Sequence, residues 1–278
     1  MPEASFERAR EFLYRSGRVL ERRLFARLYE DGDADGVVAA VLAYRNADGG
    51  FGHGLEPDKL APQSQPLDVQ LALQRLTEVG TDARELGAAA CGFLETVADD
   101  RGLVPIVLPS VAAYPRADHW GDGNFPPGLN PTVAIAGYLH ALGVEHPWLE
   151  RATVTCFEAL ENETLTEAHE ILAAAVFVER VPGADRLAPR LAEALPEASW
   201  FLADPSGEGY GVPPTKFPRE WFSAALYDAH LDRLEGEQAE DGGWPVAWEP
   251  PGPGSLAAWR AILTLEAIAT LRANGRLD

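Results

Sequence analysis

Apolar residues along this chain recur every three or four positions, which is the spacing of amphipathic helices. Val69, Leu73 and Leu76 form one such stripe. Asn130-Pro131 is a typical helix start, because it combines an amide cap with a proline suited to the first helical turn. No stretch alternates apolar and polar residues convincingly, as a half-buried strand would. The pattern predicts an all-α protein of about ten helices, most of them joined by short turns.

The predicted helices differ in how much of their surface is apolar. The boundaries read from the pattern include Ser5–Leu28, Val37–Arg45, Glu167–Val181, Asp185–Leu202, Trp221–Gln238 and Ser255–Asn274. The last of these has apolar residues on more than one side, so we expect it to be buried all round or to line an internal cavity. Residues 101–127 and 204–218 are predicted to be long loops.

Two turns between predicted helices have nearly the same sequence. They are Gln238-Ala239-Glu240-Asp241-Gly242-Gly243-Trp244 and Asn46-Ala47-Asp48-Gly49-Gly50-Phe51. In both, the amide can bond free backbone groups at a helix end, and the glycines can adopt backbone angles closed to other residues. The aromatic ring can be buried beside the reversal. The match indicates an internal repeat.

The spacing of these residues resembles the QW motif of the terpenoid cyclase and protein prenyltransferase superfamily. Gln238, Gly242 and Trp244 fit it directly, and Asn46, Gly49 and Phe51 fit it with Asn for Gln and Phe for Trp. A degraded third copy is expected at Trp120–Phe125. The resemblance implies an α/α toroid, which is a barrel of antiparallel helical hairpins, as a single domain over residues 1–278.

Composition limits the partners and the compartment. The formal net charge is −20, so a nucleic acid backbone would be repelled over most of the surface. Cys91 and Cys156 lie in apolar helical patterns without a Cys-x-x-Cys spacing, as reduced thiols of a cytoplasmic protein do. The N-terminus has no apolar signal core, and the longest strongly apolar run, Ile171–Val178, is too short to cross a bilayer. We therefore expect a cytoplasmic protein without a membrane span.

Each reaction of the superfamily depends on residues that can be sought in the chain. Proton-initiated cyclases carry Asp-x-Asp-Asp, protein prenyltransferases bind zinc through Asp, Cys and His, and thioester proteins carry Gly-Cys-Gly-Glu-Gln. The chain contains neither Asp-x-Asp-Asp nor Gly-Cys-Gly-Glu-Gln. Neither cysteine has an Asp two residues before it, as the zinc site of the prenyltransferases would require. His140, His169 and His230 lie on separate predicted helices without a metal-ligand spacing, so no metal site is predicted. The resemblance supports the scaffold and leaves the reaction open.

The acids best suited to proton chemistry follow the first turn. Glu56 and Asp58 lie in a proline-bounded loop with His53 nearby, and burial can keep a carboxyl group neutral so that it protonates an alkene or epoxide. Aromatic faces would stabilise the resulting cation, and the available rings are Phe51, Trp120, Tyr210, Trp221 and Trp244. Two structural interpretations stay open. The carboxylates can instead bond backbone donors of their own loop, and Phe51 and Trp244 can simply pack the turns.

We expect an isoprenoid-processing, terpene cyclase-like enzyme. A non-catalytic toroid that binds a lipid or a partner protein is one alternative, and a carbohydrate-active α/α barrel with two carboxylates across a polar cleft is another. No cofactor is predicted, except Mg²⁺ if the substrate is a diphosphate. Lys59 and Lys216, the two lysines of the chain, lie in candidate loops and could mark an anion site. The arginine-rich helix Ser5–Leu28 leaves peripheral contact with an anionic membrane open, although its glutamates favour a solvated face.

Overall fold

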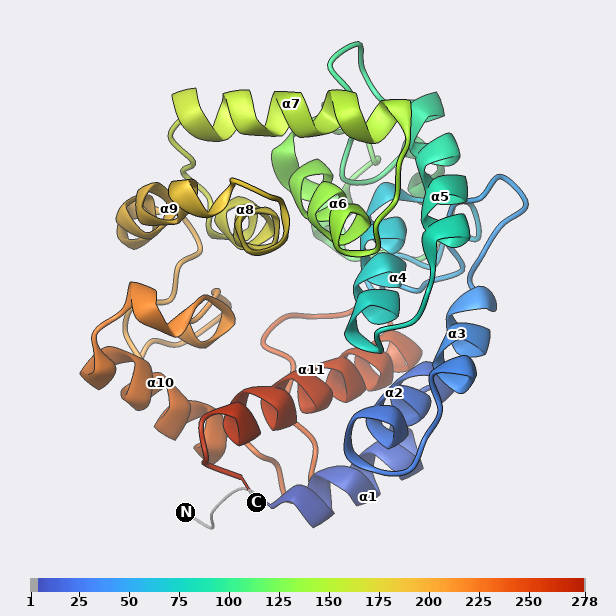
Figure 1. The fold of residues 1–278 in the computed structure, drawn as a ribbon. Helices are drawn as coiled ribbons and strands as arrows, with labels where there is room; N and C mark the ends of the chain where they lie inside the picture. Colours follow the sequence, from blue (N-terminus) through green and yellow to red (C-terminus); the bar gives the residue numbers. More distant parts are fainter. Residues whose placement is uncertain (1–4, 278) are drawn as a thin grey trace. The chain divides into compact units, whose positions relative to one another are not determined.

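The computed structural model describes residues 5–277, and its regular structure is helical. The α-helices within this range are α1 (Phe6–Ser16), α2 (Val19–Tyr29), α3 (Ala34–Leu42), α4 (Pro66–Glu78), α5 (Arg84–Val97), α6 (Leu129–Ala141), α7 (Pro147–Asn162), α8 (Ala168–Arg180), α9 (Ala188–Ala194), α10 (Ala224–Gly236) and α11 (Pro253–Ala273) (Figure 1). Outside the helices, strand-like pairing of the described residues is confined to isolated bridges. The prediction of an all-α protein is confirmed, whereas the closed ring of hairpins stays a prediction.

The described chain divides into two compact units. Unit 1 consists of residues 5–40 and 202–277 and contains α1, α2, α10 and α11. Unit 2 is the continuous segment 41–201 and contains α4 to α9. Unit 1 is therefore built from both ends of the chain, and the single domain predicted over residues 1–278 stays a prediction.

The predicted helix Ser5–Leu28 is wrong in one respect, because the chain breaks in its middle. α1 ends at Ser16 and α2 begins at Val19. Gly17 between them is extended (φ −71°, ψ 152°), and its N–H bonds the carbonyl of Leu13 at 2.9 Å. Leu13 and Leu20 are buried on either side of the break. The apolar periodicity therefore continues through the break and conceals it.

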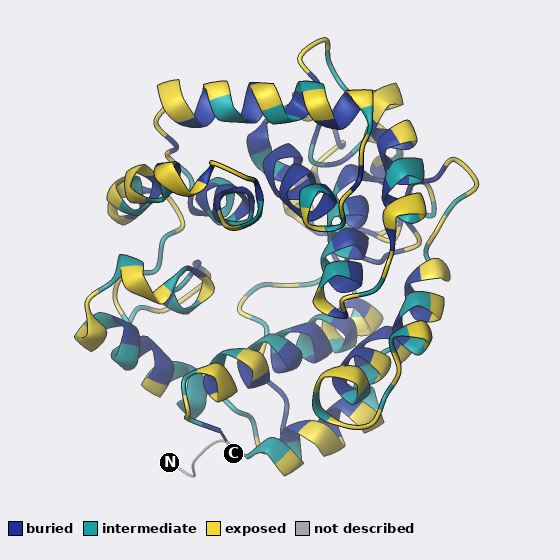
Figure 2. Ribbon diagram, in the orientation of Figure 1, coloured by how far each residue is buried: buried dark blue, intermediate teal, exposed yellow. Residues whose placement is uncertain are grey.

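In unit 2, α6 is the central helix of the core. It packs against α4, α7 and α8, and every residue from Pro131 to Leu139 is buried (Figure 2). Gly137 permits the closest approach, since a Cβ there would lie 2.9 Å from the carbonyl oxygen of Val176 on α8. Only a residue without a side chain fits where two helix backbones come this close.

In unit 1, α11 is the core helix, as its all-round apolarity predicts. It packs against α1, α2 and α10, and its buried residues run from Ser255 to Leu271. Among the described helices, α11 is the one long and apolar enough to match a membrane span, and 50% of its most apolar window is buried inside the protein. Such burial is typical of the core helix of a globular unit, so α11 is weak evidence for a span.

The two repeat turns have the same hydrogen bonds. Asn46 N–H donates to Gly50 O and Gly49 N–H to Asn46 O in the first, and Ala239 N–H donates to Gly243 O and Gly242 N–H to Ala239 O in the second. Gly49 and Gly242 have φ angles of +89° and +93°, which glycine adopts without steric cost. In this bonding pattern Asn46 is equivalent to Ala239. The amide residue of the second turn, Gln238, therefore comes one position earlier than the amide residue of the first.

Each turn packs its first glycine against the backbone of a helix. A Cβ on Gly49 would lie 2.4 Å from the carbonyl oxygen of Ala89 on α5, and one on Gly242 would lie 2.1 Å from that of Arg8 on α1. A Cβ on the second glycine of each turn would meet a phenylalanine ring of the same helix. Gly50 faces Phe93, four residues after Ala89, and Gly243 faces Phe12, four residues after Arg8. The turns are therefore structural copies, and α1 has in unit 1 the place that α5 has in unit 2.

A third copy exists, but the expected location at Trp120–Phe125 is wrong. That segment packs its glycine Gly123 against Leu108 and Pro109 rather than against an α-helix. The repeated bonding occurs instead at Asp99–Leu103, where Asp99 N–H donates to Leu103 O and Gly102 N–H to Asp99 O. Gly102 has a φ of +88°, and a Cβ there would lie 3.1 Å from the backbone nitrogen of Ala152 on α7. Because this copy lacks the amide and the glycine-aromatic pair, the motif does not reveal it.

Gln238 ties the last turn to the first helix. Its Oε1 accepts hydrogen bonds from the Ser5 N–H and the Arg8 guanidinium, both at 2.8 Å. Its Nε2 donates to the carbonyls of Ser5 and Gly242, both at 2.9 Å. The side-chain amide is thus fully bonded, and residues near the two ends of the chain meet at this point.

Replacing Gly242 by alanine should destabilise the protein, because the new Cβ would lie 2.1 Å from the carbonyl oxygen of Arg8. We expect the free energy of unfolding to fall by about 2–4 kcal/mol, measured by urea denaturation followed by circular dichroism. Gly254→Ala is the matched control, since a Cβ there meets nothing within 4 Å. The control should stay within about 1 kcal/mol of the wild type. Equal losses in both variants would contradict the role given to the close approach.

Candidate functional site

Two loops of unit 2 that carry candidate residues are joined side by side. Ala117 N–H, in the loop before α6, donates to the carbonyl of Asp58, in the loop before α4, at 2.7 Å. Leu60 N–H donates back to the carbonyl of Pro115 at 3.0 Å. Two further bonds, from Leu67 N–H at the start of α4 to the carbonyl of Ile106 and from Gly128 N–H just before α6 to the carbonyl of Val104, place both helix starts beside the segment 104–106.

A buried ion cluster fixes the first of these loops. The Lys59 ammonium lies 2.9 Å from Asp68 Oδ2 and 3.2 Å from Glu56 Oε2, and the three side chains are 1%, 0% and 5% exposed. Asp68 also accepts the backbone N–H of Glu56 at 2.6 Å. Asp68 belongs to the first turn of α4. The cluster therefore holds the loop against the start of its helix.

Two carboxyl groups share one ammonium group in this cluster. Burial raises the pKa of Asp68 to about 6, against the opposing charge of Lys59. Burial would lower the pKa of Lys59, but the charges of Asp68 and Glu56 outweigh it and raise that pKa. The ammonium is thus charged at neutral pH, so Glu56 faces a cation. These buried charges tie the loop to the first turn of α4.

Groups that a substrate could reach lie at the end of the second loop. His119 is exposed, and its ring centroid is 4.5 Å from that of Trp120. Partial burial lowers the pKa of His119; the charge of Glu56 acts in the opposite direction and that of His169 in the same direction. His119 is therefore within electrostatic range of the first loop and of the start of α8. A pocket of ≈ 340 Å³ beside it is lined by Arg116, Ala117, Asp118 and Gly121.

The N-terminus of α8 adds three titratable side chains. The Glu167 carboxylate caps the helix by accepting the N–H groups of His169 and Glu170, both at 3.2 Å, and it also bonds His169 Nδ1. Burial opposes the ionisation of Glu167, but these bonds outweigh it and lower its pKa. Burial and repulsion from Glu167 and Glu163 raise the pKa of Glu170. Neighbouring carboxyl groups with separated pKa values are typical of acid–base sites.

The three predicted catalytic residues have different surroundings. Glu56 belongs to the buried ion cluster, and Asp58 is buried with its carbonyl bonded to Ala117. His53 is exposed with a φ of +58°, and its Nε2 lies 2.9 Å from Asn46 Oδ1. His53 thus bonds to the first repeat turn, the Glu56 carboxylate pairs with Lys59 rather than with backbone donors, and Asp58 uses its backbone carbonyl in the bond to Ala117.

The predicted substrate-binding rings also differ in their surroundings. Phe51 and Trp244 are buried in the repeat turns, Trp120 is buried with Val107 and Val111 in a small apolar cluster, and Tyr210 and Trp221 are partly exposed in unit 1. The Trp244 indole N–H donates to the carbonyl of Leu234 at 2.7 Å. These contacts favour a packing role for Phe51, Trp120 and Trp244.

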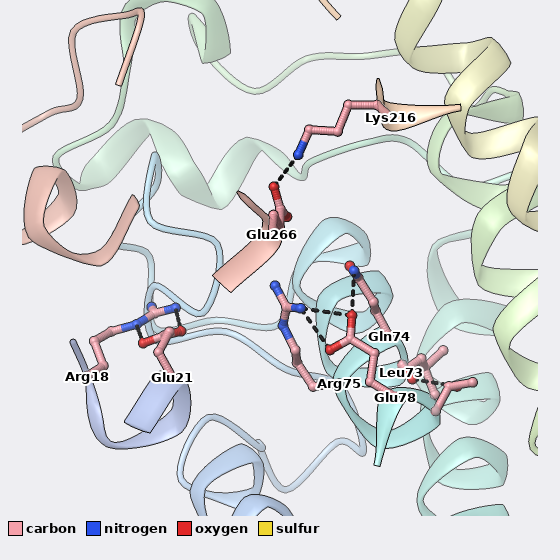
Figure 3. Close-up of polar contacts among 9 residues, drawn as sticks. Arg18, Glu21, Leu73, Gln74, Arg75, Glu78, Lys216 and Glu266 are labelled. Carbon is pink, nitrogen blue, oxygen red and sulfur yellow. Dashed lines mark hydrogen bonds and ion pairs between the residues drawn. The ribbon is translucent and has the colours of Figure 1, made fainter. Parts of the chain in front are cut away.

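Other polar contacts stabilise individual elements (Figure 3). Arg75 bonds both carboxylate oxygens of Glu78 at 2.9 Å in the last turn of α4, Arg18 bonds those of Glu21 at 2.7 and 3.0 Å at the start of α2, and Lys216 pairs with Glu266 of α11. Lys216 therefore has a carboxylate partner, and so does Lys59. Within residues 5–277, no group of three or more His, Cys, Asp or Glu side chains could hold a metal ion.

Sequence reasoning did not single out Asp68, His119, Glu167 or Glu170. They come from three separate stretches of the chain, so no short motif contains them. One available signal was Lys59, because a rare lysine among acidic residues in a proline-bounded loop suggests an ion cluster. Another was Glu167, an oxygen-bearing side chain just before an apolar helical run, where capping residues occur.

Replacing Lys59 by methionine should leave two buried carboxyl groups without a counter-charge. We expect the free energy of unfolding at pH 7 to fall by about 3–5 kcal/mol. The pKa of Asp68 is about 6 with Lys59 present, and removing the ammonium should raise it further, so the loss due to Asp68 should shrink as the pH falls towards 6 and change little below that value.

Lys216→Met is the matched control, because Lys216 is 33% exposed in its ion pair with Glu266. Its loss should stay below about 1 kcal/mol. Thermal and urea denaturation at several pH values measure both variants. A pH-independent loss in Lys59→Met would contradict the buried-charge explanation.

No protein-family model matches the chain, and no curated protein sequence matches it. Among solved structures, the crystal structure of a protein from Actinoplanes is similar over 97% of this chain and 98% of that chain, with a TM-score of 0.64 and 17% sequence identity. This likeness shows a shared fold.

Proposed function

We propose that the protein is an isoprenoid-processing enzyme of the terpene cyclase type, in which an acid at the start of α8 initiates the reaction. One observation carries the proposal: half-buried Glu170 lies next to the helix-capping carboxylate of Glu167, and burial and that charge raise the pKa of Glu170 while the pKa of Glu167 is lowered. The resemblance of the repeat turns to the QW motif supplies the substrate class. The fold that this resemblance implies is an α/α toroid, and the all-helical structure agrees with it.

Proton transfer in this proposal uses two side chains in the first turn of α8, Glu170 and His169. Glu170 donates its proton to an alkene or epoxide, so that a bond to hydrogen forms on the substrate while the acid becomes a carboxylate and the substrate a cation. His169, oriented by its bond to Glu167, accepts the proton that leaves a carbon next to the cation. Glu170 thus takes the role that the sequence suggested for Glu56 and Asp58, because a substrate can reach it.

A second candidate is a non-catalytic toroid that binds a lipid or a partner protein. The burial of Glu56 and Asp58 favours this second candidate. Glu56 is paired with Lys59, as an acid with a purely structural role would be. The first candidate requires turnover that depends on Glu170, whereas the second predicts ligand binding without any reaction.

Mass spectrometry of extracts tests the proposal. Cells would express the protein together with synthases for prenyl diphosphates of different chain lengths, with lysate incubations repeated with and without a Mg²⁺ chelator. We expect a new product with the wild type and at least about a hundredfold less with Glu170→Gln, at an unchanged melting temperature. Product formation should also fall as the pH rises through the raised pKa of Glu170, because only the protonated acid donates.

Glu158→Gln, at an exposed position on α7, is the matched control and should keep full activity. Full activity of Glu170→Gln would refute the assignment of the acid, and Asp58→Asn would then test the remaining candidate. Binding of an apolar ligand without any product would favour the non-catalytic alternative.

A further inference from the structure

Three aromatic rings of unit 1 form a connected cluster at its surface. The centroids of Tyr210 and Trp248 are 5.3 Å apart with their planes at 77°, and those of Trp248 and Trp259 are 5.0 Å apart at 79°. Tyr210 and Trp248 come from two loops, and Trp259 comes from α11. Contacts between near-perpendicular rings thus connect two glycine- and proline-rich segments to the core helix of the unit.

The cluster remains in contact with solvent. Tyr210 is 40% exposed, and Leu256, one helical turn before Trp259, is 41% exposed. Trp248 and Trp259 are partly exposed as well. Single exposed apolar residues need no explanation, but large rings gathered at one place on a surface mark a binding site more often.

The two loops that supply the rings carry acidic charges alone. Residues 203–213 contain Asp204 and Glu208, residues 245–254 contain Glu249, and neither segment has a lysine, arginine or histidine. Arg233 donates hydrogen bonds to the carbonyls of Pro205 and Gly207 in the first loop, and it forms an ion pair with Glu237 at 2.7 Å. Arg260, next to Trp259 in the sequence, forms an ion pair with Asp241 at 2.7 Å. The local charge is therefore negative, like that of the whole chain.

We propose that the cluster of Tyr210, Trp248 and Trp259 binds an organic cation of the quaternary ammonium or methylated amine class. The faces of aromatic rings attract such cations within about 6 Å of the ring centroid. Rings at 77° and 79° to one another present faces in different directions, which suits a rounded cation better than a flat ligand. The acidic loops raise the local concentration of any cation.

The charge of the ligand is the distinguishing property. A quaternary ammonium group has no N–H to donate, so it depends on ring faces and on nearby carboxylates rather than on hydrogen bonds. A neutral sugar or an alkyl chain would use the same rings without needing the acidic loops. This inference is independent of the proton chemistry proposed for α8.

Isothermal titration of the full chain with choline tests the proposal, with 3,3-dimethylbutan-1-ol as the uncharged molecule of the same shape. We expect saturable binding of choline and at least about tenfold weaker binding of the alcohol. Trp248→Leu should abolish choline binding, and Tyr210→Leu should weaken it. Tyr14→Leu, which removes a ring that is 39% exposed on α1, should leave it unchanged.

A second pair of variants tests the charge. Replacing Glu208 and Glu249 by glutamine should weaken choline binding several-fold, whereas Glu197→Gln, at an exposed position of unit 2, should not. Melting temperatures verify that each variant is folded. Equal binding of choline and the alcohol, binding of glucose in preference to choline, or no binding of choline would each overturn the proposal.

Discussion

The repeat turns depend on a contact in which backbone meets backbone with no side chain between them. The carbonyl oxygens of Ala89 and Arg8 lie 2.4 and 2.1 Å from where a Cβ on Gly49 or Gly242 would stand, which is too close for any side chain. This contact fixes how far each turn lies from its helix, and the phenylalanine four residues on then covers the second glycine. Glycine is thus required by the distance between chains as well as by the turn itself.

The buried ion cluster has a comparable role in the loops of unit 2. A lysine that is 1% exposed is stable only where its counter-charges are fixed, and Asp68 and Glu56 come from a helix and from the loop before it. The cluster therefore determines the path of the loop, to which the segment carrying His119 is bonded through Asp58 and Ala117. Groups that position the loop are buried, while the groups suited to proton transfer are half-buried or exposed.

Much of the fold follows from periodicity and turn chemistry. The stripe at Val69 and Leu73 correctly indicates α4, and the all-round apolarity of α11 indicates a core helix. Periodicity cannot detect the break at Gly17, because the apolar positions on both sides remain in phase. The motif likewise cannot locate the turn at Asp99–Leu103, since its shape comes from backbone bonds and one glycine rather than from an amide and an aromatic ring.

The candidate site was less accessible to sequence reasoning. The properties of Glu170 arise from burial and from the charges of Glu167 and Glu163, and the tertiary part of such an environment is invisible in a linear sequence. The loop sequence indicates Glu56 and Asp58 as candidate acids, but spacing alone cannot indicate that both are buried or that Glu56 pairs with Lys59.

The bonds between Gln238 and the start of α1 have a consequence for biosynthesis. Residues 41–201 form a continuous segment whose internal contacts become available as soon as it leaves the ribosome. The N-terminal helices emerge earlier, yet the turn that packs on Arg8 is translated about 230 residues later. The nascent chain must therefore carry an incomplete apolar surface on α1 until that turn has left the ribosome, which is an interval in which a chaperone could act.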